Sequence, residues 1–337
     1  MVTRSIVFCS VCMATGANGL LLHTSRVHHR WALGMEAAAS NDVSDMQLIA
    51  FLRDGHVVTR GLLSPDLVEK ELKPSVLEMY ASNQLQSWQH KVRVHIGADT
   101  TDATTVEECQ RLLRDANVPA DAIPFLQLFN LWYGSEGARS VALAPELGRV
   151  AARLLGCPAV RVYQDSLFVK RRGDGPTRWH SDLNMAPFDT NDFVTCWIPL
   201  QAVPTQENGG SGLTYASGSH RDFALPYWSD PCETDLSERY EVVTDHGAFA
   251  IGDAAWHHGW TLHSAPGNAL GDTRYAYSVS FVADGARLLE SEGHIRYPDN
   301  EDDASYAAWI DDIGWGGRAE HTLLPLTWSE EDDNHDG

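Results

Sequence analysis

The chain has 337 residues, of which 43% are hydrophobic and 21% are charged, so it can bury a large core and lacks the composition of a disordered protein. Its formal net charge of −21 opposes binding to phosphate backbones and anionic lipid heads, so we expect no nucleic-acid partner. No apolar run is long enough to suggest a membrane span. The six cysteines are scattered and predict neither a disulfide framework nor a zinc ribbon.

Residues 1–40 differ in composition from the rest of the chain. They carry no acidic residue before Glu36, and their first apolar stretch follows an arginine. This pattern is typical of a targeting leader for an organelle (plastid or mitochondrion) or for the secretory route, and the alternative is a disordered N-terminus on a cytoplasmic protein. We predict one folded domain over 41–328 and a solvated acidic tail over 329–337.

The first part of the predicted domain has helical signals. A capping box at Ser44 begins a helix that ends at Gly55. A short strand follows at 56–60, and Pro65 stands at the first position of a second helix that runs toward Tyr80. Further helices are predicted at 107–116, 125–133 and 145–155.

After residue 156 the hydrophobic period changes to two, which is typical of strands. Strands are predicted at 159–170, 192–202, 211–217, 247–251, 256–263 and 273–283. Helices followed by strands indicate an α+β protein in which helices brace a sheet sandwich or barrel.

Two histidine-containing segments offer metal ligands. His180 and Asp182 stand two residues apart, so an extended backbone would present both side chains to one ion. The segment 256–263 adds His257, His258 and His263, and any one of these histidines is a possible third ligand. Two histidines and one carboxylate are the ligand set of non-haem iron(II) enzymes, and a zinc enzyme is the alternative.

Arg274 begins a predicted strand, where Ser278 shares its face. An arginine that points inward among apolar residues needs an anion, and its planar fork suits a carboxylate. The alternative is a structural salt bridge to one of the many acidic residues.

Together these features resemble the phytanoyl-CoA dioxygenase family of iron(II)- and 2-oxoglutarate-dependent oxygenases, from about residue 50 to about residue 285. The resemblance implies a double-stranded β-helix, a jelly-roll or cupin-like barrel, braced by N-terminal helices. The segments that carry it are FLRDGHVVTRGLLSPD at 51–66, the HxD at 180–182, ENGG at 207–210, ASGSH at 216–220, Gly252-Asp253, His263, Asn268 and Arg274.

The resemblance also implies a site. His180, Asp182 and His263 would bind iron(II), and Arg274 would bind the distal carboxylate of 2-oxoglutarate, with Ser278 as a helper. Further expected residues of the pocket are Gln164, Thr195 and Trp197, of which Trp197 has core packing as its alternative role.

The sequence departs from the family where a serine often follows the distal histidine by two residues, because Ala265 stands there and Ser264 is one residue early. His258 is the reserve third ligand. Related halogenases lack the carboxylate of the HxD, so Asp182 favours hydroxylation. A dry aromatic wall is expected from Trp179, Trp197, Trp256 and Trp260.

The sequence therefore predicts a dioxygenase that uses iron(II), 2-oxoglutarate and O2 to hydroxylate a C–H bond of a small or lipid-like metabolite, with succinate and CO2 as co-products. Two alternatives stay open at this point. One is a cupin-like metalloenzyme that does not use 2-oxoglutarate, and the other is a barrel that only binds a ligand. Nothing in the sequence indicates the oligomeric state.

Overall fold

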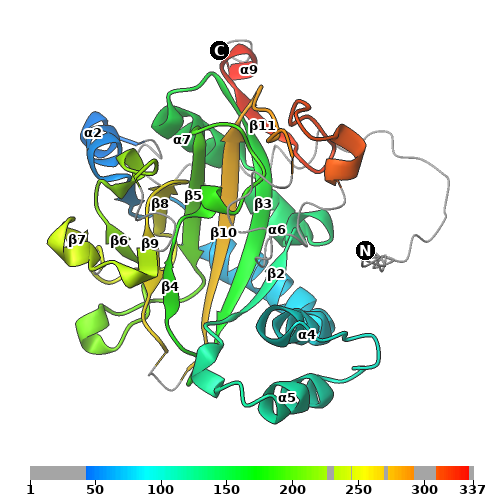
Figure 1. The fold of residues 1–337 in the computed structure, drawn as a ribbon. Coiled ribbons are helices and arrows are strands. Elements are labelled where there is room, and N and C mark those ends of the chain that lie inside the picture. Colours follow the sequence, from blue (N-terminus) through cyan, green and yellow to red (C-terminus); the bar gives the residue numbers. More distant parts are fainter. Residues whose placement is uncertain (1–42, 226–230, 244, 269–271, 292–308, 334–337) are drawn as a thin grey trace. The chain divides into compact units, whose positions relative to one another are not determined.

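The computed structural model describes residues 43–225, 231–243, 245–268, 272–291 and 309–333. The predicted leader lies outside these ranges, as does the end of the predicted acidic tail. Two antiparallel sheets form the centre of the described part, and helices from the N-terminal half pack against the larger one (Figure 1). This is the predicted jelly-roll arrangement.

Within the described residues the larger sheet has seven strands in the order β1-β8-β5-β10-β3-β11, with β2 also paired to β3. Its central pair, β3 and β10, runs in register from Lys170 opposite Arg274 to Val160 opposite Ala283, with one irregularity after Ser280. The strands are β1 (His56–Thr59), β2 (Leu126–Phe129), β3 (Ala159–Lys170), β5 (Phe193–Pro199), β8 (Ala254–His258), β10 (Arg274–Ala283) and β11 (Leu326–Ser329).

The smaller sheet has four described strands in the order β4-β9-β6-β7. The pairing of β4 with β9 places His180 directly opposite His263, which brings together two residues that lie far apart in the sequence. The strands are β4 (Thr177–His180), β6 (Thr214–Ala216), β7 (Val242–Val243) and β9 (His263–Ala265).

Helices cover the outer face of the larger sheet. α7 contacts β3, β5, β10 and β11 through buried apolar residues on one of its faces, among them Leu147, Val150 and Leu154. The helices are α2 (Asp45–Asp54), α3 (Pro65–Leu67), the π-helical η1 (Val68–Leu72), α4 (Lys73–Ile96), α5 (Val106–Asp115), α6 (Glu136–Ala142), α7 (Pro145–Leu155) and α9 (Glu330–Asp333).

The local start and stop signals of the helices are confirmed. Ser44 forms the capping box at the start of α2, and Gly55 ends that helix in the left-handed conformation with φ 80°. A Cβ at Gly55 would lie 2.4 Å from Thr261 Oγ1, so the close approach of this turn requires glycine. The helix that begins at Pro65 is longer than predicted, because it continues through η1 and α4 to Ile96.

The predicted helix at 125–133 is wrong. Residues 126–129 form β2, whose Leu126 and Leu128 are buried, and the 3-10 turn η3 (Leu131–Tyr133) follows. β2 exists because it pairs with β3, a contact between distant segments that overrides the local helical pattern.

Two predicted strands are also corrected. At 247–251 only an isolated bridge joins Phe249 to Val203, because the Asp253 carboxylate accepts the Ala250 N–H and supports a turn. The predicted strand 256–263 is two strands in different sheets, since β8 ends at His258 and a turn separates it from β9. The sequence predicted His257 and His263 on one strand, but they lie on two strands of different sheets.

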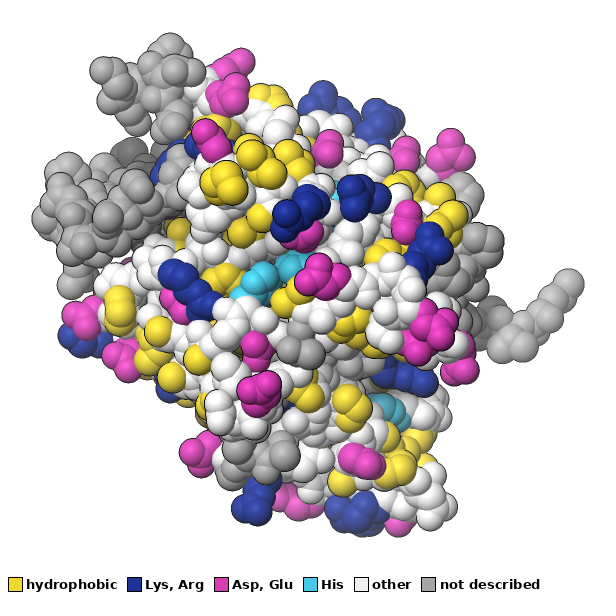
Figure 2. Space-filling view, turned by 90° about the vertical axis from the view of Figure 1, so that its left-hand side faces the viewer, with side chains coloured by type: hydrophobic (Ala, Val, Ile, Leu, Met, Phe, Trp, Pro, Cys, Tyr) yellow, Lys and Arg dark blue, Asp and Glu magenta, His cyan; other side chains and the backbone are white. Residues whose placement is uncertain are grey.

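The predicted acidic tail starts inside ordered structure, because Ser329 ends β11 and residues 330–333 form α9. No helix among the described residues is long and apolar enough to cross a membrane. The face shown in Figure 2 carries acidic and basic side chains interspersed with apolar ones, and apolar side chains gather at the level of α2, where Met46, Ile49 and Leu52 are exposed.

Candidate active site

Three predicted ligands meet between the two sheets. His180 ends β4, Asp182 begins the 3-10 turn η4 (Asp182–Asn184), and His263 begins β9. One ligand atom of each residue lies within 4.8 Å of the others. Asp182 Oδ1 is 3.8 Å from His180 Nε2 and 3.6 Å from His263 Nε2. These distances leave room for one ion between the three atoms.

The imidazole tautomers suit metal binding. His180 Nδ1 lies 2.8 Å from the Arg178 carbonyl oxygen, and His263 Nδ1 lies 3.1 Å from the Thr261 carbonyl oxygen. A carbonyl only accepts, so each Nδ1 carries the proton and each Nε2 keeps its lone pair for the cavity. Burial holds the pKa of His263 well below its usual range, which keeps that ring neutral.

The second oxygen of Asp182 is held by the protein. The Thr195 hydroxyl donates to Asp182 Oδ2 at 2.6 Å, and His257 Nε2 lies 3.0 Å from the same oxygen. Desolvation alone would raise the pKa of Asp182, but His263 and His257 more than offset it and lower the pKa. Asp182 is thus an ionised group whose Oδ1 is directed toward the two histidines.

The structure separates the three histidines of the segment 256–263. His257 lines the cavity and contacts the carboxylate of Asp182. The sequence did not predict this role, because it did not predict the break between β8 and β9. His258 turns the other way, where its Nδ1 accepts the Trp260 N–H and its ring lies near His220. Of the three, only His263 belongs to the group that could hold a metal, so His258 is not a ligand in this arrangement.

The opposite end of the cavity holds Arg274, which is only 7% exposed. Its Nε donates to Ser211 Oγ at 3.3 Å, and the guanidinium carbon lies 5.5 Å from the centre of the Trp197 ring. Among the described residues no carboxylate pairs with it. Burial lowers the pKa of Arg274 to about 10, so it stays charged at neutral pH. A buried cation without an acid fits the carboxylate of a ligand.

All eight predicted site residues line one cavity of about 310 Å³. Ser278 on β10 lies between Trp197 on β5 and Ser166 on β3, in the register of the larger sheet. Ala265 lines the cavity in place of the family's serine, while Ser264 does not. The predicted residues in the lining are Gln164, His180, Asp182, Thr195, Trp197, His263, Arg274 and Ser278.

Several lining residues were not predicted. Ser280 bonds to Thr195 at 3.0 Å, and it shares the strand face of Arg274, a periodicity that would have revealed it. Gln127 was missed because its segment was predicted to be helical. Ser211 is outside this lining but accepts the Arg274 Nε–H, and it follows two glycines in a loop without a recognisable signal in the sequence. The apolar part of the lining includes Val94, Pro124, Phe125, Tyr163, Phe168, Met185, Phe193 and Leu213.

The predicted aromatic wall is wrong for three of its four members. Trp197 lines the cavity, but Trp179 packs against the outer cluster around Leu262. Trp256 is buried elsewhere and donates its Nε1–H to Thr59 Oγ1 at 3.0 Å. Trp260 lines a second cavity, because the strand break after His258 turns it to the outer side.

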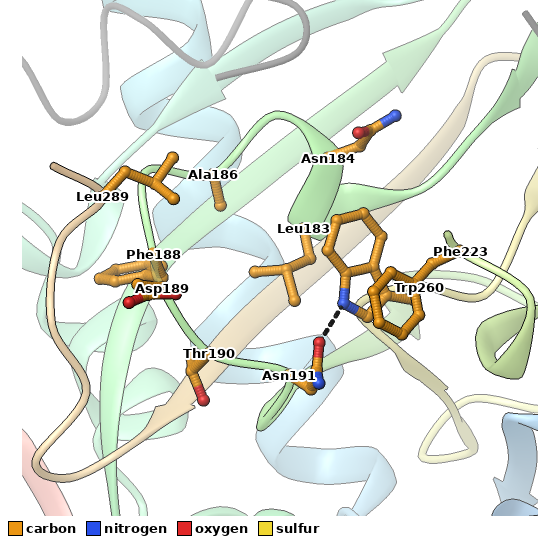
Figure 3. Close-up of a pocket in the computed structure, with 10 residues that line it drawn as sticks. All are labelled: Leu183, Asn184, Ala186, Phe188, Asp189, Thr190, Asn191, Phe223, Trp260 and Leu289. Atoms are coloured by element: carbon orange, nitrogen blue, oxygen red, sulfur yellow. Dashed lines mark hydrogen bonds between the residues drawn. The ribbon is translucent and has the colours of Figure 1, made fainter. Parts of the chain in front are cut away.

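This second cavity has a volume of about 420 Å³ and lies along the segment that follows Asp182 (Figure 3). Trp260 stacks on Phe223 with ring centres 4.9 Å apart and donates its Nε1–H to Asn191 Oδ1 at 2.8 Å. Asp189 is the one titratable residue in its described lining, so its chemistry does not match that of a redox or acid–base site.

The fold is a jelly-roll barrel. Its cavity has an HxD and a distal histidine at one end and a buried arginine at the other. This combination defines the class of iron(II)- and 2-oxoglutarate-dependent oxygenases. The sequence model of the family named phytanoyl-CoA dioxygenase (PhyH) matches residues 51–276, and the chain belongs to this family. The protein is therefore a 2-oxoglutarate-dependent dioxygenase, with iron(II), 2-oxoglutarate and O2 as its cofactors and co-substrates.

Solved structures share the fold. The non-haem α-ketoglutarate-dependent carbocyclase SnoK from nogalamycin biosynthesis is 20% identical with a TM-score of 0.57, and the match covers 86% of this chain and 98% of that chain. The epimerase SnoN in complex with Fe3+, α-ketoglutarate and nogalamycin RO is 21% identical with a TM-score of 0.57, and the match covers 84% and 98%. EctD from S. alaskensis with bound Fe is 20% identical with a TM-score of 0.51, over 74% and 81%. No curated protein matches the sequence.

Proposed function

We propose that the protein hydroxylates an unactivated C–H bond of a small, largely apolar metabolite, with iron(II) bound by His180, Asp182 and His263. One observation supports the ligand assignment: Nε2 of His180, Nε2 of His263 and Oδ1 of Asp182 lie within 4.8 Å of one another. When bound, iron(II) with 2-oxoglutarate and O2 supplies the oxidant, and 2-oxoglutarate leaves as succinate and CO2.

The residues of this chain position and enclose that chemistry. Thr195 and His257 fix Asp182 so that Oδ1 is the oxygen available to the ion. Arg274 supplies the fork for the distal carboxylate of 2-oxoglutarate, and Ser278, Gln164 and Trp197 line the space between. The alternative of a cupin-like enzyme requires Arg274 to pair with a protein acid, and the described residues supply none.

The cavity supports a small substrate. Its volume of about 310 Å³ must hold 2-oxoglutarate as well as the reacting part of the substrate. Ligand sites span about 300–1,000 Å³, so the space is at the lower end of that range. Phe125, Phe168 and Leu213 give the remaining wall an apolar character. A bulky polar group such as a CoA thioester would have to stay outside.

The retained carboxylate supports hydroxylation as the outcome. Asp182 is present and occupied by two protein hydrogen bonds, so no small residue opens a halide site beside the two histidines. The expected products are an alcohol, succinate and CO2.

The test is anaerobic addition of iron(II) and then 2-oxoglutarate, followed by the weak visible charge-transfer band of the chelated co-substrate. We expect the band in the wild-type protein, its loss in His263→Ala, and its retention in His258→Ala, the matched control on the same segment. Loss of the band in His258→Ala with retention in His263→Ala would overturn the ligand assignment. Iron binding without a band would overturn the role of Arg274.

A further inference from the structure

Lys170 is a fully buried lysine at the end of β3, on the same strand face as three residues of the cavity lining, Gln164, Ser166 and Phe168. Its partner in the neighbouring strand is Arg274, because the two residues stand opposite each other in the pairing of β3 with β10. The family motif explains neither its position nor its burial. A charge in such a place needs a physical reason, since removing a lone ammonium from water is costly.

The Lys170 ammonium is held in a fixed place beside the cavity. Nζ donates to the Pro124 carbonyl oxygen at 2.9 Å and to the Gly175 carbonyl oxygen at 2.7 Å. It also lies 3.5 Å from Thr177 Oγ1. Three acceptors match the three N–H bonds of the charged form. Pro124 and Thr177 both line the cavity, so the charge lies directly behind its wall.

The backbone of Lys170 is fixed as well. Asn268, one of the residues that carry the family resemblance, donates its Nδ2–H to the Lys170 carbonyl oxygen at 2.9 Å. The Asn268 N–H donates to the Asp174 carbonyl oxygen at 3.0 Å. These bonds tie the loop after β3 to the loop before β10, so Lys170 and Arg274 keep their relative positions.

No described protein acid neutralises the pair. The charged groups that act on Lys170 are Arg274 on β10 and Asp174 in the loop after β3. The Asp174 carboxylate already accepts two hydrogen bonds from Arg171. Arg171 Nη2 donates to Asp174 Oδ1 at 2.6 Å, and the Arg171 backbone N–H donates to Asp174 Oδ2 at 2.6 Å. Burial, together with the charge of Arg274, lowers the pKa of Lys170 to about 7, and Asp174 offsets these two causes only in part. One end of the cavity thus holds two cations and no free anion among the described residues.

We propose that Lys170 is a positioning residue that adds a second positive charge behind Arg274 and makes this end of the cavity selective for a dicarboxylate 2-oxo acid. The inference rests on the proposed function, because the ligand is the distal carboxylate of the co-substrate. All three N–H groups of the Lys170 ammonium donate to protein acceptors. Lys170 therefore acts on the carboxylate through the electrostatic potential and not through a direct hydrogen bond.

This role makes the affinity depend on pH. Below about pH 7 Lys170 is charged in the ligand-free protein, and above it the ammonium is lost. A carboxylate bound to Arg274 favours the charged form and raises the pKa of Lys170, so binding at higher pH must take up a proton. The affinity for 2-oxoglutarate therefore falls as the pH rises through about 7, whereas a 2-oxo acid without a distal carboxylate is unaffected.

The experiment compares 2-oxoglutarate with pyruvate on the iron(II)-loaded wild-type protein without oxygen. The dissociation constants are measured from the charge-transfer band at about pH 6.5 and at about pH 8.5. We expect the constant for 2-oxoglutarate to rise about tenfold and that for pyruvate to change less than about twofold. Pyruvate controls for titration at the metal, which both acids share.

Variants assign the effect to Lys170. Lys170→Met keeps the length and removes the charge, so it should bind 2-oxoglutarate about tenfold more weakly at the lower pH and lose the pH dependence. Asp165→Asn is the matched control, because Asp165 is on the same strand with a pKa of about 7 but faces away from the cavity. This control should keep the wild-type pH dependence.

A metal-free readout separates the two proposals. Glutarate carries a carboxylate for Arg274 but cannot chelate iron, and it should raise the melting temperature of the metal-free wild-type protein more at the lower pH than at the higher one. If neither 2-oxo acid gives a band while glutarate behaves in this way, the proposed function fails and Lys170 keeps its role. A pH-independent affinity for 2-oxoglutarate overturns the inference, even where Lys170→Met does not fold.

Discussion

Two buried aspartates, Asp182 in the cavity and Asp165 on the opposite face of β3, have pKa values that their surroundings shift in opposite directions. In the cavity, His263, His257 and the Thr195 hydroxyl surround Asp182 and lower its pKa despite desolvation. Behind β3, burial raises the pKa of Asp165 to about 7, although the Tyr277 hydroxyl donates to it at 2.5 Å.

The difference shows what makes a buried carboxylate useful for metal binding. Asp182 keeps Oδ1 free and directed toward two imidazoles, so an ion would find an ionised ligand already in place. Asp165 Oδ2 accepts hydrogen bonds from the Tyr277 hydroxyl and the Trp132 N–H, and no cation in the described part of the chain favours its charged form. The first carboxylate serves the site, whereas the second holds the turn after β2 against the sheet.

The largest expected effect comes from neutralising Asp182 at constant shape, with the same change at Asp165 as the control. Asp182→Asn should weaken iron(II) binding by more than about 100-fold and reduce succinate formation to background, because even outer partners of a metal ligand contribute about 10–100-fold. Asp165→Asn should bind iron(II) as the wild type does. Iron content after dialysis and succinate release measure both, and full iron binding in Asp182→Asn would contradict the ligand assignment.

The next effect concerns the opposite end of the cavity. Arg274→Ala should raise the Michaelis constant for 2-oxoglutarate about 10–100-fold, because a hydrogen bond to a charged group contributes about 1.5–3 kcal/mol. The turnover number at saturating co-substrate should fall much less. Arg172→Ala, an exposed arginine in the loop after β3, is the control and should leave the constant unchanged. An unchanged constant in Arg274→Ala would remove that residue from the site.

A smaller effect tests the support of Asp182. Thr195→Val removes the hydroxyl that holds Oδ2 at nearly constant volume, so iron(II) affinity should fall about tenfold, at the low end of what such partners contribute. Ser280→Ala removes a neighbour of Thr195 that does not touch Asp182, and it should have a lesser effect. Equal affinities in Thr195→Val and the wild type would show that His257 alone positions the carboxylate.

The smallest effect on catalysis, but a measurable one on stability, belongs to Asp165. Its pKa is raised from 3.8 to about 7 on folding, so the folded protein holds the proton more tightly than the unfolded chain between these values. Wild-type stability should therefore fall as the pH rises through that window, by up to about 4 kcal/mol. Urea unfolding at about pH 5 and about pH 8 should show this loss in the wild type and not in Asp165→Asn. A loss of the same size in Asp165→Asn would assign it to another group.

Which groups form the site was predictable because each signal is local. His180 and Asp182 are two residues apart, and Arg274 and Ser278 lie on one strand face, so backbone geometry alone directs each pair to one side. The cap at Ser44 and the turn at Gly55 are likewise set by a few neighbouring residues. The family resemblance then joined the separate signals into one expected site.

The errors have a common cause. Residues 126–129 form a strand because β3 offers an edge for pairing, and His257 and His263 lie in different sheets because a turn follows β8. Neither event is encoded within the segment itself, since a strand is stable only with its partner. Trp256 and Trp260 were assigned to the cavity for the same reason.

The sequence by itself determined the chemical identity of the site: two imidazoles, a carboxylate and a guanidinium, with the local spacing that lets each point inward. Only the tertiary structure decided that His180 lies opposite His263, that Asp182 offers Oδ1 while Thr195 and His257 hold Oδ2, and that Lys170 lies behind Arg274. The physical reason is range, because caps and strand parity act over a few residues, whereas pairing across a closed barrel joins residues that the chain separates widely.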